Sequence, residues 1–187
     1  PTIPTRWHDD AGRDQIAAAM DDFATDRVVV KRQIGAGGLG QHSFTRNSLP
    51  AEEWRMDRAC MVQPFLPGVV EEGEYTLVFV DGVFSHGVLK RAAQGEYRIQ
   101  SLYGGYECAY EPEAADLAAA QIVVDALPFD DLLYARIDMV RLPSGQLAVM
   151  EAELIEPYLY PQQGSDLGKR LARAIVARLK GGDGNGG

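Results

Sequence analysis

Two glutamates, Glu151 and Glu153, stand two residues apart in the otherwise apolar run VMEAELIEP. If this run forms a strand, its side chains alternate between faces, so both carboxylates point the same way. Two carboxylates on one face of a buried strand repel each other and are costly to desolvate. The pair therefore indicates either a half-solvated strand edge or a site for a hard cation, since Mg²⁺ takes oxygen ligands and bridges carboxylates to substrate phosphates.

A third carboxylate, Asp138, lies in the run LLYARIDMVR, which we expect to form a strand over Leu133–Arg141. The turn sequence PSG joins it to a second expected strand over Gln146–Leu154, so the two would pair as a hairpin. In that hairpin Asp138 would converge with the two glutamates. Arg136 shares a face with Asp138, so a local ion pair between these two residues is the alternative interpretation.

A glycine-rich segment, Ile34–Ser43, follows a run that predicts a strand over Val28–Gln33. Its four clustered glycines are Gly35, Gly37, Gly38 and Gly40. Such density suits neither a helix nor a strand interior. The segment is either a flexible connection or a loop whose amides close over phosphate oxygens. It is not a Walker A motif, because no GK[ST] follows, and no clear helix opens after it as a Rossmann fingerprint requires.

Two further features could bind a nucleotide together with this loop. Lys31, in the preceding strand, is either a solvated lysine or a point charge for a phosphate. The run MVQPFL predicts a strand over Met61–Leu66 that Pro64 interrupts. Its free backbone groups could hydrogen-bond a flat heterocycle, although an ordinary linker between lobes has the same appearance.

Elements that would position these residues are spread over the whole chain. We expect helices over Gly12–Phe23, Pro50–Arg58, Pro112–Leu127 and Asp166–Lys180, a hairpin over Gly73–Lys90 that turns at Asp81-Gly82, and a strand over Glu96–Gln100. In the last helix the four-residue repeat of Leu167, Leu171, Ile175 and Leu179 predicts a core-facing stripe, with Lys169, Arg170, Arg173 and Arg178 on a solvated face.

Composition narrows the class of protein. The 187 residues are 46% hydrophobic and 24% charged, which is typical of a globular chain, and the net charge of −9 disfavours general nucleic-acid binding. Cys60 and Cys108 lack CxxC spacing and stand among apolar or aromatic neighbours, so we expect buried free thiols and a reducing cytoplasm. The three histidines lack zinc-site spacing. No apolar run is long enough to span a membrane.

The order of these motifs carries more information than any one of them. A lysine-bearing strand, a glycine loop, VQPFLP, the GEYTLVFVDG hairpin ending in LK, RIQ followed by GG, RID and EAE succeed one another over about 130 residues. This order resembles the ATP-grasp superfamily, and within it the ATP-binding region of glutathione-synthetase-like and cycloserine-ligase-like enzymes. The resemblance implies an α+β fold of two lobes, with ATP between a small lobe and a larger, mainly antiparallel lobe.

The resemblance also implies roles for individual residues. It implies nucleotide contacts from Lys31, the loop glycines Gly35, Gly37, Gly38 and Gly40, the hinge residues Gln63, Pro64, Phe65 and Leu66, and from Glu74, Lys90 and Met150. It implies Mg²⁺ ligands, with Mn²⁺ as an alternative ion, at Asp138, Glu151 and Glu153. It implies catalytic roles beside the transferred phosphoryl group for Arg98, Lys90 and Arg136, with Gln100 nearby. Most family members carry Asn where Glu153 stands, so this site would hold one extra negative charge.

The implied activity is ATP-dependent joining of a small carboxylate to an amine through an acyl phosphate, with no nucleic-acid or membrane partner. Residues 1–66 would form the small lobe, 67–180 the larger lobe and 181–187 a disordered tail. Family enzymes normally carry an N-terminal domain that completes the substrate pocket, so we expect this chain to be an ATP-binding portion that associates with such a domain or forms a homodimer. The alternative is a nucleotide-binding or regulatory module without catalysis.

Overall fold

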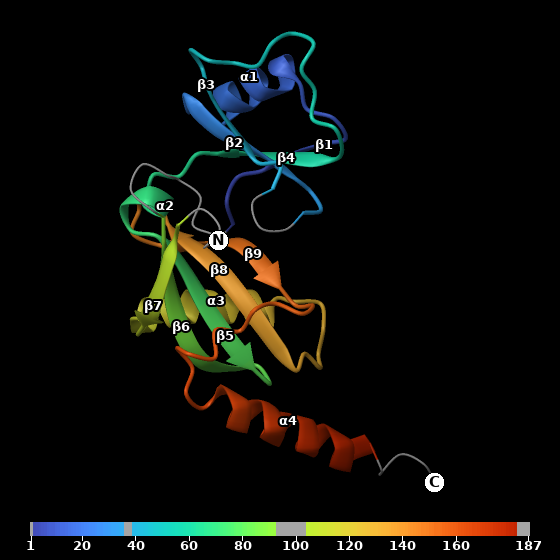
Figure 1. The fold of residues 1–187 in the computed structure, drawn as a ribbon, viewed down its shortest axis with the longest axis vertical. Helices are drawn as coiled ribbons and strands as arrows, with labels where there is room; N and C mark the ends of the chain where they lie inside the picture. Colours follow the sequence, from blue (N-terminus) through green and yellow to red (C-terminus); the bar gives the residue numbers. More distant parts are fainter. Residues whose placement is uncertain (1, 36–38, 93–103, 183–187) are drawn as a thin grey trace. The chain divides into compact units, whose positions relative to one another are not determined.

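The computed structural model describes residues 2–35, 39–92 and 104–182, and the chain divides into two units, Thr2–Pro67 and Gly68 onward. Each unit contains one sheet, and neighbouring strands in both sheets pair antiparallel. Helices and strands follow one another without the regular alternation of a parallel α/β fold, as the ribbon shows (Figure 1). The predicted α+β class is confirmed.

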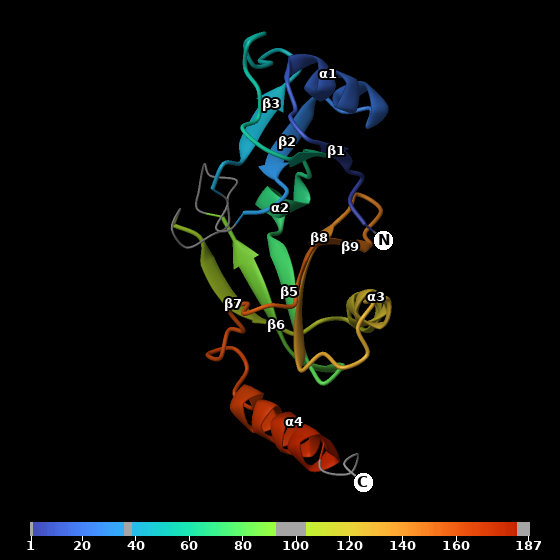
Figure 2. The same cartoon turned by 90° about the vertical axis from the view of Figure 1, so that its right-hand side faces the viewer.

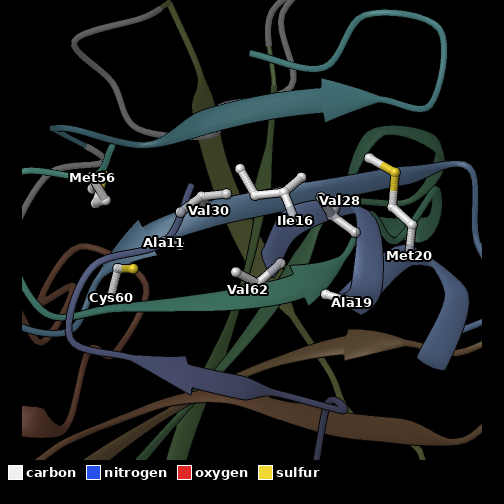
Figure 3. Packing of buried hydrophobic residues seen from close by; sticks show 9 residues of the cluster. All are labelled: Ala11, Ile16, Ala19, Met20, Val28, Val30, Met56, Cys60 and Val62. Carbon is white, nitrogen blue, oxygen red and sulfur yellow. The ribbon is translucent and has the colours of Figure 1, made fainter. Parts of the chain in front are cut away.

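The Thr2–Pro67 unit is a four-stranded sheet in the order β1-β4-β2-β3, with α1 packed on one face. Its elements are β1 (Arg6–His8), α1 (Arg13–Asp22), β2 (Arg27–Arg32), β3 (His42–Thr45) and β4 (Cys60–Pro64). Ile16 and Met20 of α1 are fully buried against Val28, Val30 and Val62 of the sheet (Figure 3). These valines share a face because β2 and β4 alternate their side chains.

The prediction of a helix over Pro50–Arg58 is wrong. This stretch forms turns, and Arg55 makes a β-bridge with Gly12. The backbone N–H of Met56 donates to the carbonyl of Ala11 at 2.8 Å, and the Met56 side chain is buried in the core of this unit. The tertiary contacts of Met56 therefore outweigh the local helix propensity.

The second unit is a five-stranded sheet in the order β7-β6-β5-β8-β9. Its elements are α2 (Gly68–Glu71), β5 (Glu74–Val80), β6 (Val83–Arg91), β7 (Tyr106–Tyr110), α3 (Ala114–Asp125), β8 (Tyr134–Arg141), β9 (Leu147–Glu153) and α4 (Leu167–Gly182). The predicted hairpin is confirmed, with φ of 55° at Asp81 and 72° at Gly82, as a two-residue type I′ turn requires. The strand expected over Glu96–Gln100 lies outside the described residues.

Helices pack on opposite faces of this sheet. Tyr75, Leu77 and Phe79 of β5 face α3, which is seen end-on beside the sheet in Figure 2, whereas Val78 and Val80 pack with α4. Every residue of β5 is consequently buried. No helix of the described chain is long and apolar enough to cross a membrane.

The predicted core stripe of α4 is only half right. Leu167 is buried and Leu171 packs with it, but Ile175 is 44% exposed and Leu179 68% exposed. A spacing of four residues advances about 40° per step around a helix of 3.6 residues per turn, so the stripe rotates away from the sheet. Arg178, predicted on the solvated face, turns inward instead and donates to the Leu132 carbonyl.

Two cysteines were expected to be buried. Cys60 is buried, but Cys108 is exposed, so that half of the prediction is wrong. Cys108 lies in β7, an edge strand of the sheet, which among the described strands pairs with β6 alone and has mostly exposed side chains. An edge strand can carry apolar residues without burying them.

A β-bulge in β9 determines which side chains share a face. Asp138 pairs with Glu151 and Met139 with Val149, so Met150 is an extra residue on one strand. Val149 consequently packs with the core beneath α3. Glu151, only two residues later, belongs to the opposite face, beside Asp138. The bulge therefore separates the apolar half of β9 from its acidic half.

Candidate active site

A polar cluster occupies the face of the five-stranded sheet that turns away from α3. Cross-strand pairing assembles it from four strands in adjoining rows. The rows are Lys90 with Glu74, then Thr76 with Asp138 and Glu151, then Arg136 with Glu153. Because directly paired residues lie on the same face, the register alone brings these side chains together.

Three carboxylates converge in this cluster. Oxygens of Asp138, Glu151 and Glu153 all lie within 4.8 Å of one another. Asp138 is 1% exposed, Glu153 is half-buried and Glu151 is exposed, so the group opens from the sheet interior toward solvent. A set of only oxygen ligands suits Mg²⁺ or Mn²⁺ rather than zinc.

Asp138 is the most heavily bonded member. Its Oδ1 accepts hydrogen bonds from the Thr76 hydroxyl at 2.6 Å and from Lys90 Nζ at 3.2 Å. Its Oδ2 accepts from Nη2 of Arg136 at 2.8 Å. Burial works against the carboxylate, but Lys90 and Arg136 outweigh it and hold the pKa of Asp138 below its usual value. Asp138 thus forms the ion pair with Arg136 and also lies in the cluster of three carboxylates, so the two interpretations of the sequence do not exclude each other.

Lys90 is shared between two carboxylates. Its ammonium donates to Glu74 Oε1 at 2.7 Å, in addition to Asp138. Burial would lower the pKa of Lys90, but the two carboxylates raise it above the ordinary lysine value, so the ammonium stays charged. Burial raises the pKa of Glu74 to about 7, with Lys90 opposing the rise and Asp138 adding to it. Glu74 therefore protonates more readily than an ordinary glutamate.

Arg136 connects the cluster to the segment between β9 and α4. Its Nη2 lies 3.0 Å from Glu153 Oε1, and its Nη1 donates to the Tyr158 carbonyl at 3.3 Å. The ring of Tyr160 lies beside both cations, with its centroid 6.0 Å from Cζ of Arg136 and 5.3 Å from Nζ of Lys90. Both cations are thus fixed by contacts on more than one side.

Two participants were not predicted from the sequence. Thr76 could have been found, because alternation along β5 places it on the same face as Glu74. Tyr160 gave no signal, since it lies in an irregular segment whose course depends on tertiary contacts. Met150, expected to contact the base, is the half-buried bulge residue of β9. Arg98, expected near the phosphoryl group, lies outside the described residues, as does Gln100.

The other expected nucleotide residues belong to the Thr2–Pro67 unit. Lys31 is half-buried in β2 and pairs with Met61, while Gln63 pairs with Val29. Alternation therefore puts Lys31 and Gln63 on the sheet face away from α1. The Gln63 side chain is buried and donates to the Thr5 hydroxyl at 3.0 Å, so its amide nitrogen serves the unit's own structure.

The expected hinge begins inside β4. Pro64 pairs with Val28, beyond the reach of β1, so its missing N–H leaves no gap in the ladder on that side. The Phe65 N–H donates to the Arg27 carbonyl at 2.9 Å, and the Arg27 guanidinium lies 3.6 Å from the centre of the Phe65 ring. Leu66 is half-buried. The Phe65 amide is thus already used within the unit.

Of the four loop glycines, Gly37 and Gly38 lie outside the described residues. Gly40 has a φ of +70°, and a Cβ added there would stand 2.6 Å from Nε of Arg32. At Gly35 an added Cβ would meet nothing closer than 3.6 Å. The backbone therefore favours glycine at position 40 but not at position 35.

A separate pocket of about 220 Å³ lies by the β5–β6 turn, lined in part by Phe79, Phe129 and Arg178. None of the polar cluster lines it. The charge of Arg178 is already paired there with Asp81 and Asp131, each at 2.9 Å. The sheet face that carries Asp138 is the better candidate for chemistry, because it combines cations with converging carboxylates.

Comparison with curated proteins finds a sequence relative. No protein-family model matches the chain. The cycloserine biosynthesis protein DcsG of Streptomyces lavendulae is 36% identical over 196 residues, which cover 96% of this chain and 65% of that protein. The chain thus spans a little under two thirds of the length of this relative.

Solved structures share the fold. The crystal structure of D-cycloserine synthetase DcsG matches with a TM-score of 0.75 at 24% identity, over 96% of this chain and 65% of that one. The ATP-grasp ligase PsnB, complexed with a precursor variant, Mg and ADP, matches at 0.66 with 16% identity, over 96% and 54%. A D-alanine–D-alanine ligase from Bacillus anthracis matches at 0.62 with 18% identity, over 98% and 64%. The sequence relative and the shared two-lobed α+β fold together support the assignment of this chain to the ATP-grasp superfamily.

Proposed function

We propose that this chain is the ATP-binding and catalytic portion of a ligase that uses ATP and Mg²⁺ to join a small carboxylate to an amine. The observation that carries the proposal is the convergence of Asp138, Glu151 and Glu153 beside Lys90 and Arg136 on one sheet face. The matching relatives support it, since one is named for cycloserine biosynthesis and another is a D-alanine–D-alanine ligase.

The residues present fit a divalent cation. Four carboxylates of the cluster face two cations, so the fully ionised cluster carries two excess negative charges. One Mg²⁺ would balance them, and Asp138, Glu151 and Glu153 would hold it through oxygen atoms. When bound, Mg²⁺ would neutralise charge on the ATP phosphates. Mn²⁺ has the same ligand preference and is the alternative ion.

The chain's own cations would act on the transferred phosphoryl group. Lys90 and Arg136 are held in place before any ligand arrives, so they would stabilise the charge that develops during phosphoryl transfer without reorganising. Transfer of the γ-phosphoryl group to the substrate carboxylate breaks the bond to ADP and forms an acyl phosphate. Attack by the amine then releases phosphate. We propose the same role for Arg98, because its RIQ motif resembles the corresponding motif of the family.

An acyl phosphate is hydrolysed by water, and the glycine segment would exclude water from it. Gly35, Gly37, Gly38 and Gly40 would close over the phosphates with backbone amides, while Lys31 contributes a point charge from β2. The hinge, Gln63, Pro64, Phe65 and Leu66, together with Met150, would hold adenine. Glu74 would lie beside the nucleotide and orient Lys90.

Thermal unfolding with and without MgATP tests nucleotide and metal binding. A ligand that binds only the native state raises the melting temperature, so millimolar MgATP is expected to raise it measurably. Replacing both Glu151 and Glu153 by Gln is expected to remove the part of the rise that depends on Mg²⁺. The matched control replaces the exposed pair Glu52 and Glu53 by Gln and should leave it intact. An unchanged melting temperature of the wild-type protein in millimolar MgATP would refute the proposal.

Release of ADP tests catalysis separately. The chain would be assayed with a panel of amino acids as carboxylate and amine donors, and phosphate and ADP would be measured together. ADP release that requires both substrates supports the ligase. Binding of MgATP without substrate-dependent ADP release would favour a nucleotide-binding module.

A further inference from the structure

Tyr160 is an uncharged residue packed into the polar cluster, and only 8% of it is exposed. Its ring centroid lies 5.3 Å from the Lys90 ammonium and 6.0 Å from the Arg136 guanidinium carbon. A ring attracts a cation over such distances. One side chain therefore contacts both of the cations that bind Asp138.

The backbone at Tyr160 adopts a conformation that tyrosine does not favour. Its φ is +50°, in the left-handed region where glycine and asparagine are the common residues. Contacts of the two preceding residues hold it there. The Tyr158 carbonyl accepts from Arg136 at 3.3 Å, and the Leu159 carbonyl lies 2.9 Å from Nε2 of His86. The segment is thus fastened to β8 and β6, and the conformation places the ring over the cations.

An aromatic ring has a property that a carboxylate lacks at this position. It attracts a cation without cancelling its charge. Lys90 already has two carboxylate partners, and Arg136 contacts Asp138 and Glu153. A further acid would leave less positive charge for a phosphoryl group, whereas the ring confines both cations and leaves their charge unchanged.

We propose that Tyr160 is a positioning residue: its ring holds Lys90 and Arg136 at the acidic sheet face and leaves their charge available to the phosphates of ATP. The part that concerns ATP rests on the proposed function. The contact between the ring and the cations rests on the structure, so the two parts can fail separately.

Three substitutions distinguish a role of the aromatic ring from a role of the backbone conformation at position 160. Tyr160→Phe keeps the ring, Tyr160→Leu removes it, and Tyr160→Asn removes it while favouring the left-handed backbone. If the residue served only the turn, Asn would be the best replacement. If the ring positions the cations, Phe is the best replacement and Asn is as poor as Leu.

The first measurement needs no ligand. Protons on the ε carbon of Lys90, near the ring, should be displaced by its ring current in the NMR spectrum, relative to the exposed Lys169. The displacement should persist in Tyr160→Phe and vanish in Tyr160→Leu and Tyr160→Asn. Its absence in the wild-type protein would overturn the contact, whatever the fate of the variants.

The second measurement is binding of a non-hydrolysable ATP analogue with Mg²⁺ by calorimetry. Tyr160→Phe should bind within about twofold of wild type, and the Leu and Asn variants should bind about tenfold more weakly, in line with the strength of cation–π contacts. The matched control is Tyr106→Leu, which removes a ring that is 56% exposed on the edge strand β7 and belongs to none of the rows of the cluster. It should change affinity less than twofold.

The outcomes distinguish the two proposals. An Asn variant equal to wild type in both measurements would reduce Tyr160 to a turn residue and overturn the inference. If the Leu and Asn variants lost the ring-current displacement but bound the nucleotide as tightly as wild type, the inference would be overturned as well. A displacement that behaves as expected in a wild-type protein that binds no MgATP would instead refute the proposed function and the role toward ATP, and would leave the cation contact supported.

Discussion

Replacing Lys90 by methionine would leave Glu74 and Asp138 buried with one cation fewer between them. Methionine has a similar length and keeps the apolar part of the side chain, so the change removes charge with little change in packing. Asp138 would retain Arg136 and the Thr76 hydroxyl. Glu74 would lose its ion-pair partner, which lies 2.7 Å away.

The size of the effect follows from this geometry. Removing one partner of a buried ion pair costs about 3–5 kcal/mol, because the remaining charge stays buried without compensation. We take ~3 kcal/mol, since Asp138 stays paired, which corresponds to a fall in Tm of about 10 °C for a chain of this size. Adding Glu74→Gln removes the uncompensated charge, so the double variant should recover at least half of the loss.

The effect should also depend on pH. The pKa of Glu74 is already raised to about 7, and loss of Lys90 would raise it further. A carboxyl group with a raised pKa favours the native state when protonated, and that stability is lost as pH rises through the native-state value. Lys90→Met should therefore be less destabilising at pH 6 than at pH 8.

Urea unfolding at both pH values measures these differences. Lys169→Met is the matched control, because the Lys169 side chain is 75% exposed where that of Lys90 is 11% exposed. The control should change stability by about 0.5 kcal/mol or less. The reasoning would be refuted if Lys90→Met matched the control, if its effect were the same at both pH values, or if Glu74→Gln brought no recovery.

Two further predictions concern stability away from the acids. Burial lowers the pKa of His86, so the folded protein should lose stability as pH falls below about 6.5, where the unfolded chain takes up the proton; a His86→Gln variant, compared with wild type by urea unfolding between pH 5 and 7, should lose less. Gly40→Ala should cost about 1–2 kcal/mol, because of its φ of +70° and the nearby Arg32, while Gly35→Ala should be nearly neutral. Equal urea midpoints for the two alanine variants would contradict the second prediction.

Alternation and turn signals were sufficient to predict most of the larger sheet. Asp81-Gly82 marks a hairpin because both residues accept positive φ, and the period of two places Glu151 and Glu153 together. The same rules predict that Asp138 joins them, since a short PSG turn leaves an antiparallel hairpin as the simple connection. These are local rules, and the structure follows them where strands pair with their sequence neighbours.

The features that were missed depend on contacts distant in sequence. Met56 is buried by α1, which turns an apparent helix into irregular chain. The cluster that Tyr160 contacts holds its backbone in the left-handed conformation. Tyrosine is not a residue that predicts a positive φ, as glycine or asparagine would. On α4, the exposed Ile175 shows that a four-residue repeat does not stay on one face of a helix.

The extra residue at Met150 shifts the alternation of β9. If β9 kept Met150 but paired with β8 without the bulge, strict alternation from Val149 would carry Glu151 to the side that packs beneath α3. Deleting Met150 would instead leave Val149 and Glu151 adjacent in a regular ladder, so each would keep its present face. Deleting Ala152 would make Glu151 and Glu153 adjacent, so the two carboxylates would lie on opposite faces of the sheet. In related sequences we therefore expect the spacing between Glu151 and Glu153 to vary less than the spacing between Val149 and Glu151.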